Sequence, residues 1–163
     1  MKPIRFPFLR SAACALVLSL LGPVCGATGP SGDSAAIERA VHEANADMIA
    51  AANRLDLDAF FAAITESAQI VQNGTIFPSR ADARAGVERG LRGVTRLERR
   101  LHDPRVTVLA PDTALLVSEG DATFTVQDGR VMTSRFAVSL VFVHRDGRWQ
   151  VVHGHYSTLP GGM

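Results

Sequence analysis

Apolar side chains recur every three or four residues in the first half of the chain, from about residue 33 onward. This spacing predicts amphipathic helices. We expect the first helix to begin at Asp33 or Ser34, the second near Asp56 or Asp58, and the third at Ser79, because these residue types cap helices. The sequence therefore predicts three helices before its second half.

In the second half, apolar and polar residues alternate, which predicts strands with one buried face. The expected strands cover residues 95–102, 106–110, 114–126, 131–144 and 149–157, after two short ones at 68–72 and 75–77. Asn73-Gly74, Asp128-Gly129 and Asp146-Gly147 are each typical of a two-residue hairpin loop. Helices followed by an antiparallel meander predict an α+β domain, with the helices packed on one face of the sheet.

Two-residue loops would also fix which residues of adjacent strands face each other. Leu140 would then lie opposite His153, and Val138 between Glu119 and His155. One face of the sheet would collect Leu115, Val117, Glu119, Asp121, Phe136, Val138, Leu140, Phe142, Trp149, Val151, His153 and His155. A single β-bulge would instead turn Gly120 and Ala122 to this face.

This face predicts a pocket that is apolar at one end and polar at the other, as small-molecule sites commonly are. The expected ligand-pocket residues are Phe136, Val138, Leu140, His153, His155 and Tyr156. His155, Asp121 and Glu119 are the candidate catalytic residues, because an imidazole or carboxylate in apolar surroundings can remove a proton next to a carbonyl. Tyr156 would donate to the developing oxyanion if a bulge turned it inward.

Less specific interpretations of the same residues stay open. The two histidines can simply end the core through hydrogen bonds. His153, His155 and Glu119 offer only a weak metal signal, and we predict no metal and no cofactor. The Arg99-Arg100 pair can hold an anion, although a solvated strand face beside Glu98 is favoured.

Three stretches resemble a known family: Asp112-Thr113-Ala114, the run Arg145-Asp146-Gly147-Arg148-Trp149, and the pattern W-x-V-x-H-x-H-x-S over residues 149–157. They are similar to the nuclear transport factor 2-like superfamily, and more narrowly to its SnoaL-like branch and the association domain of calcium/calmodulin-dependent protein kinase. The resemblance covers residues 34–160. It implies a cone-shaped fold, with three N-terminal helices on a strongly curved antiparallel sheet and a pocket between them.

The resemblance does not imply one activity, because relatives include isomerases, cyclases, dehydratases, binding domains and oligomerisation modules. It does imply frequent homodimerisation through the sheet. The kinase association domain holds small carboxylates with pocket arginines, whereas this chain has Gly120, Leu140 and Tyr156 at the matching positions. We therefore do not assign the carboxylate-binding role of that domain to this chain.

Residues 1–27 read as a secretory signal peptide, followed by a linker over residues 28–33. Positive charges at Lys2, Arg5 and Arg10 precede a short apolar run, and small residues offer cleavage positions at Gly26 and Ala27. The lysine-poor composition suggests a bacterial chain, exported to the periplasm or out of the cell. Lipid attachment at Cys25 is the less favoured alternative, because the preceding residues do not form a lipobox.

Without the predicted signal peptide, the chain has 14 Arg and 16 acidic residues, a formal net charge of −2. This balance argues against a nucleic-acid partner. No membrane contact is expected after cleavage. The sequence thus predicts an exported homodimeric domain that binds a small molecule, with an isomerase, cyclase or dehydratase and an oligomerisation module as alternatives.

Overall fold

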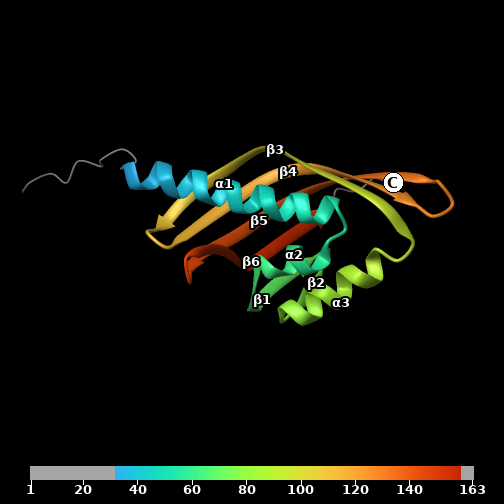
Figure 1. Cartoon of the computed structure of the whole chain (residues 1–163), viewed down its shortest axis with the longest axis horizontal. Helices are drawn as coiled ribbons and strands as arrows, with labels where there is room; N and C mark the ends of the chain where they lie inside the picture. The colour runs from blue at the N-terminus through green and yellow to red at the C-terminus, as the bar shows by residue number, and fades with distance from the viewer. Residues whose placement is uncertain (1–31, 159–163) are drawn as a thin grey trace, which may run out of the picture.

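A computed structural model describes residues 32–158 (Figure 1). The predicted signal peptide and most of the predicted linker lie outside the described residues. The elements are α1 (Gly32–Asn53), α2 (Leu57–Ala62), β1 (Ile64–Gln72), β2 (Thr75–Phe77), α3 (Arg80–Gly90), β3 (Val94–Ala110), β4 (Thr113–Val126), β5 (Val131–Arg145) and β6 (Arg148–Thr158). No helix in this part of the chain is long and apolar enough to cross a membrane.

The three predicted helices are present, and two of the predicted caps are confirmed. The Asp56 carboxylate accepts the Ala59 N–H at 3.0 Å and begins α2. The Ser79 hydroxyl accepts the Asp82 N–H at 3.2 Å and begins α3. These side chains satisfy amide groups that the first turn of a helix leaves unpaired.

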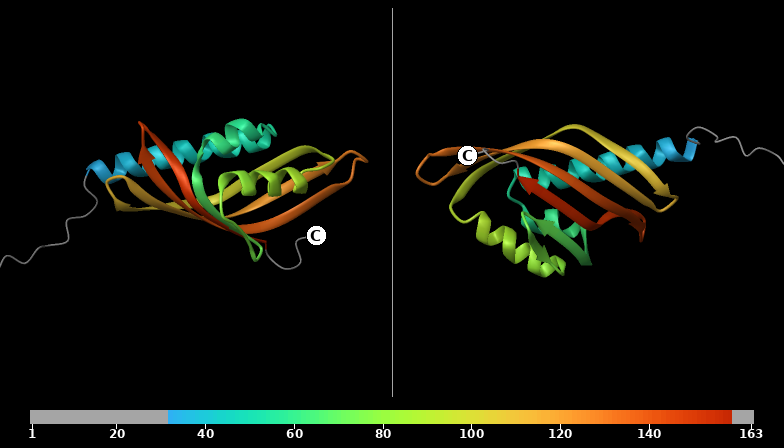
Figure 2. Two further views of the ribbon diagram at one scale, coloured as in Figure 1. Left: turned by 90° about the horizontal axis from the view of Figure 1, so that it is seen from below. Right: turned by 180° about the vertical axis from the view of Figure 1, so that it is seen from behind.

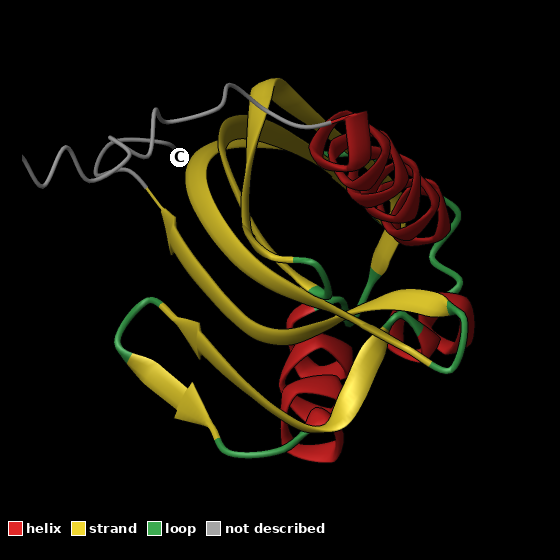
Figure 3. Cartoon of the chain, turned by 90° about the vertical axis from the view of Figure 1, so that its left-hand side faces the viewer, coloured by secondary structure: helices red, strands yellow, loops and turns green. Residues whose placement is uncertain are grey.

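The strands form one sheet in the order β2-β1-β6-β5-β4-β3. It curls strongly, and all three helices lie on its concave side (Figures 2 and 3). This arrangement confirms the predicted α+β class. The sheet is mixed rather than purely antiparallel, because β1 runs parallel to β6. The strands predicted separately at 95–102 and 106–110 are one strand, β3, which continues through Asp103 and Pro104 with a register shift after His102 and a left-handed Asp103 (φ 45°).

Two of the three predicted hairpin loops are confirmed. Both central residues have positive φ in Asn73-Gly74 (48° and 81°) and in Asp146-Gly147 (51° and 75°), as a type I′ turn requires. Asp128-Gly129 differs, because the Val126 N–H bonds to the Arg130 carbonyl and encloses a three-residue loop. Only its glycine has positive φ, at 83°. The register of β4 against β5 therefore shifts by one residue from the prediction.

A β-bulge in β6 causes a second shift. Phe142 pairs with Val151 and Val141 pairs with His153, so Val152 is the extra residue. Leu140 consequently faces Gly154 instead of His153, and Val138 faces Tyr156 instead of His155. These two shifts decide which side chains reach the concave face.

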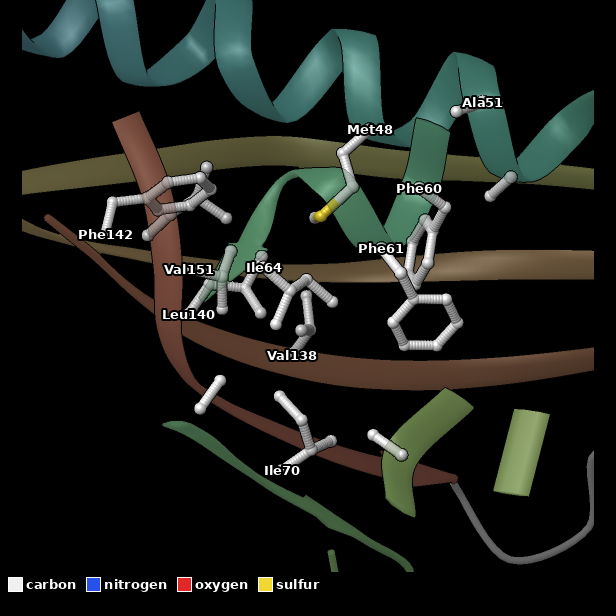
Figure 4. Packing of buried hydrophobic residues seen from close by; sticks show 14 of the residues in the cluster. Met48, Ala51, Phe60, Phe61, Ile64, Ile70, Val138, Leu140, Phe142 and Val151 are labelled. Carbon is white, nitrogen blue, oxygen red and sulfur yellow. The ribbon is translucent and has the colours of Figure 1, made fainter. Parts of the chain in front are cut away.

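The core lies between α1 and the concave face of the sheet (Figure 4). Its largest fully buried side chains are Val41 and Met48 of α1, Leu116 of β4, Leu140 and Phe142 of β5, and Val151 of β6. Burying such a side chain stabilises the fold by about 1.5–3 kcal/mol. With Leu97 of β3, which belongs to the same cluster, this core joins α1 to the four long strands.

Candidate functional site

A cavity of about 230 Å³ lies between the concave face of the sheet and the three helices. Its buried lining residues are apolar, and its most exposed ones, Gln72 and Gly90, mark the mouth. The lining comprises Met48, Ala52, Leu57, Phe60, Phe61, Ile64, Ile70, Gln72, Ala83, Gly86, Val87, Gly90, Leu91, Leu97, Arg99, Phe124, Val151 and Tyr156. The cavity thus has an apolar floor and a few polar groups.

The glycine at position 86 lets α3 pack closely on the β1–β2 hairpin. A Cβ atom at Gly86 would lie 2.6 Å from the Phe77 ring, well inside van der Waals contact. Ala83 and Gly86 of this helix both line the cavity. Small residues on α3 therefore keep the helix near the sheet while leaving room inside.

Arg99 is the only charged residue among the described residues that line the cavity. It lies on β3 opposite Ala122 of β4, yet its guanidinium carbon is 5.3 Å from the ring centroid of Phe136 on β5. The same carbon lies 5.5 Å from the ring of Tyr156 on β6. The side chain must therefore cross β4, and it can do so because Ala122 and Gly120 present almost no side chain there.

Among the described residues, the Arg99 guanidinium has aromatic neighbours but no carboxylate partner. Some arginines of the described residues pair with carboxylates, for example Arg84 with Asp58 at 2.6 Å and Arg135 with Glu119 at 3.2 Å. Others do not, but Arg99 is the one that lines the cavity. Within residues 32–158, no carboxylate lies within 4 Å of Arg99. Contact with aromatic faces stabilises such a cation by about 0.5–2 kcal/mol. Because this contact does not use the guanidinium N–H groups, they stay available as hydrogen-bond donors.

Tyr156 lies beside Arg99 because the bulge at Val152 turns it to the concave face. Burial raises the pKa of the Tyr156 phenol above its ordinary value of 10, and the nearby Arg99 charge opposes part of this rise. The phenol is therefore neutral at physiological pH and can donate a hydrogen bond. Arg99 and Tyr156 together offer two kinds of donor near the cavity mouth.

The candidate catalytic residues do not lie in this cavity. The prediction that Glu119, Asp121, His153 and His155 share the buried face is wrong, because the two register shifts turn all four to the convex face. The Asp121 carboxylate accepts a hydrogen bond from His102 Nε2 at 2.8 Å, and Glu119 forms an ion pair with Arg135. Water solvates these charges there, whereas the concave face would have buried them at a large cost.

The convex face has its own hollow of about 610 Å³, which is more open to solvent than the cavity and has both polar and apolar lining. It is lined by His102, Asp103, Arg105, Val117, Ser118, Glu119, Ala137, Val138, Ser139, His155 and Ser157. No three His, Cys, Asp or Glu side chains among the described residues converge in an arrangement that could hold a metal ion. Of the candidate catalytic residues, Glu119 and His155 thus share this hollow, away from the apolar cavity, and Asp121 does not line it.

The remaining predicted pocket residues separate into two groups. Tyr156 lines the cavity. Phe136, Val138 and Leu140 lie on the concave face, but they are buried in the core beside the cavity and do not line it, although Phe136 supports the Arg99 guanidinium. The sequence pattern indicated Arg99 only as part of the Arg99-Arg100 pair, which can hold an anion but for which a solvated strand face was favoured. The place of Arg99 between Leu97 and Leu101 on an alternating strand was the signal that it shares their face.

The model of the SnoaL-like domain family matches residues 41–160. No curated protein matches the chain. A candidate scytalone dehydratase from Novosphingobium aromaticivorans has a similar fold (TM-score 0.73, 12% identity, covering 78% of this chain and 87% of the other).

Two further structures show that this fold occurs in proteins of different kinds. One is a type 2 hexachlorocyclohexane dehydrochlorinase (TM-score 0.65, 12% identity, covering 79% of this chain and 93% of the other). The second is a candidate calcium/calmodulin-dependent protein kinase II association domain from Xanthomonas campestris (TM-score 0.61, 19% identity, covering 83% and 91%). At these identities, the similarity establishes the fold alone.

Proposed function

Because the chain belongs to the SnoaL-like domain family, whose fold is nuclear transport factor 2-like, we propose that its cavity binds a compact apolar molecule with one anionic head group. The observation that carries this proposal is Arg99, a cation at the wall of a mainly apolar cavity that has no carboxylate partner among the described residues. Its fork of N–H donors suits a planar carboxylate. An aromatic carboxylate is the simplest ligand of this kind.

The arrangement of floor and mouth supports this ligand class. Phe60, Phe61 and Val151 are buried and supply an apolar floor against which a flat ring system can pack. Arg99 and Tyr156 are half-buried, so a head group beside them would lie nearer the solvent than the ring system. The ligand would enter ring first, and its head would meet two donors.

The residues that line the cavity favour binding over turnover. Within residues 32–158, none of them is Asp, Glu or His, the groups that most often remove a proton from carbon. Tyr156 has a raised pKa and is therefore a hydrogen-bond donor rather than a base. We propose that the domain holds its ligand without changing it chemically.

A matched pair of probes tests the proposal. We expect 2-naphthoate to bind the purified domain at pH 7 at least about tenfold more tightly than 2-naphthamide, which has the same ring system but a neutral head. Isothermal titration calorimetry measures both affinities. Equal affinities, or tighter binding of the amide, would remove the anionic ligand from consideration.

The convex face provides a second expectation. Glu119→Gln and His155→Ala are expected to leave the affinity for 2-naphthoate within about twofold of the wild type, because both residues lie on the side of the sheet opposite the cavity. The same titrations measure this effect. A loss of tenfold or more in either variant would place the ligand on the convex face.

Export and assembly are proposals as well. Domains of this fold bind small molecules and often oligomerise. We propose that this chain acts as a homodimer after export, and the support for export is the sequence of residues 1–27. N-terminal sequencing of the protein isolated from its native cells, with light scattering on the same sample, tests both points.

A further inference from the structure

A side chain from α1 holds the backbone of Arg99 in place. The Arg99 N–H donates to Asn53 Oδ1 at 2.7 Å, and Asn53 Nδ2 donates to the Arg99 carbonyl at 3.1 Å. Asn53 is the last residue of α1 and is half-buried. One amide thus engages both backbone groups of a residue that is 46 positions away in the sequence.

The position of β3 in the sheet explains why this contact is available. β3 is an edge strand whose sheet partner is β4. Along such an edge, alternate residues direct their N–H and C=O groups away from the sheet, where they have no strand partner. Asn53 gives Arg99 the two hydrogen bonds that another strand would have made.

The same contact determines where the Arg99 side chain starts. That side chain crosses β4 above Ala122 before it reaches Phe136 and Tyr156. A small rotation of the backbone at its origin would move the guanidinium by several times as much at the far end. Fixing the Arg99 backbone therefore fixes the location of the positive charge.

We propose that Asn53 is a positioning residue that sets the preference of the cavity for an anionic over a neutral ligand. This inference rests on the proposed function, since it acts through the Arg99 guanidinium as the partner of the anion. Asn53 does not line the cavity and would not touch the ligand. Its effect is confined to the head group.

The end of α1 does not depend on the Asn53 side chain. The Leu55 N–H bonds to the Ala52 carbonyl at 2.9 Å, and the Asp56 N–H bonds to the Ala51 carbonyl at 3.0 Å. Leu55 adopts a left-handed conformation with φ 57°, as is usual where a helix ends in this pattern. We therefore expect Asn53→Ala to keep the helix end and to release mainly the Arg99 backbone.

The test compares two affinities in each variant. In Asn53→Ala, we expect the preference for 2-naphthoate over 2-naphthamide to fall about fivefold. This fold-change corresponds to the net free energy that one hydrogen bond contributes. The affinity for 2-naphthamide itself should stay within about twofold. Asn53→Ser removes the same clamp with a polar residue and serves if the alanine variant does not fold.

Gln150→Ala is the matched control. Gln150 is also a buried amide that bonds a distant backbone group, since its Nε2 donates to the Ala62 carbonyl at 3.1 Å. The Gln150→Ala variant should have a lower free energy of unfolding but the same preference between the two probes. An equal change of preference in Gln150→Ala would show that general loosening, and not positioning, explains the effect.

Arg99→Met separates failure of this inference from failure of the proposed function. If Arg99→Met abolishes the preference while Asn53→Ala and Asn53→Ser leave it intact, the positioning role is overturned and the proposed function stands. If Arg99→Met itself leaves the preference unchanged, both the positioning role of Asn53 and the proposed function are overturned. A reduced preference in the Asn53 variants together with its loss in Arg99→Met supports both.

Discussion

Arg99→Met is expected to lower the affinity for 2-naphthoate about 10- to 150-fold and to leave the affinity for 2-naphthamide nearly unchanged. Hydrogen bonds to charged groups contribute about 1.5–3 kcal/mol, which corresponds to this range. Methionine has a similar length and can still pack on Phe136 and Tyr156, so the change removes mainly the charge. Calorimetric titration of both probes measures the two affinities.

The free energy of unfolding of this variant should fall by no more than about 0.5–2 kcal/mol, the contribution of the lost contact between the charge and the aromatic rings. Arg99 is half-buried and no carboxylate among the described residues pairs with it, so no ion pair is lost. Arg100→Met is the control: Arg100 is exposed on the opposite face of the same strand and should leave both affinities unchanged. A similar loss of 2-naphthoate binding in both variants would mean that net charge, and not the cavity, attracts the anion.

Gly120→Ala is expected to destabilise the fold by about 2–3 kcal/mol. A Cβ atom at this position would lie 2.5 Å from the Arg100 carbonyl oxygen and 2.6 Å from the Phe136 ring. The first of these contacts is with backbone of the adjacent strand, which cannot swing aside as a flexible side chain can. Urea denaturation of the variant and the wild type measures the difference.

Gly90→Ala supplies the matched control for this substitution. Gly90 ends α3, and a Cβ atom there would meet no atom within 4 Å. Alanine also has the higher helix propensity, so the free energy of unfolding should stay the same or rise by a few tenths of a kcal/mol, about the gain seen for such changes. If Gly120→Ala were as stable as Gly90→Ala, the register that places Gly120 against Phe136 would be wrong.

Local signals predicted the helices, the strands and two hairpin loops, because capping residues and Asn-Gly or Asp-Gly pairs act through their immediate neighbours. They failed at Asp128-Gly129 because the same dipeptide also suits a three-residue loop in which only the glycine has positive φ. The bulge at Val152 has no comparable local signal. Each error moved a strand by one residue, which exchanges its two faces.

The cost of burying charge could have corrected the register. One face of β4 carries Leu116, Gly120 and Ala122, and the other carries Glu119 and Asp121. The concave face takes the first set, because burying two carboxylates costs far more than burying small residues. A glycine inside a strand also signals a close approach, here by the Phe136 ring.

The candidate site was harder to predict than the fold, because it depends on contacts across three strands. Arg99 reaches Phe136 only when β3, β4 and β5 are in their actual register and Ala122 leaves the path open. The Asn53 clamp joins residues far apart in the sequence and leaves no local pattern. Tyr156 could be assigned to the pocket only conditionally, since its face depends on the bulge.

A crystal structure of the protein with 2-naphthoate tests the central claim most directly. We expect the ring system beside Phe60 and Phe61, and a carboxylate oxygen about 2.7–2.9 Å from a guanidinium nitrogen of Arg99, the usual distance for such a charged pair. A ligand bound in the hollow of the convex face, or in the cavity with its carboxylate turned away from Arg99, would contradict the account.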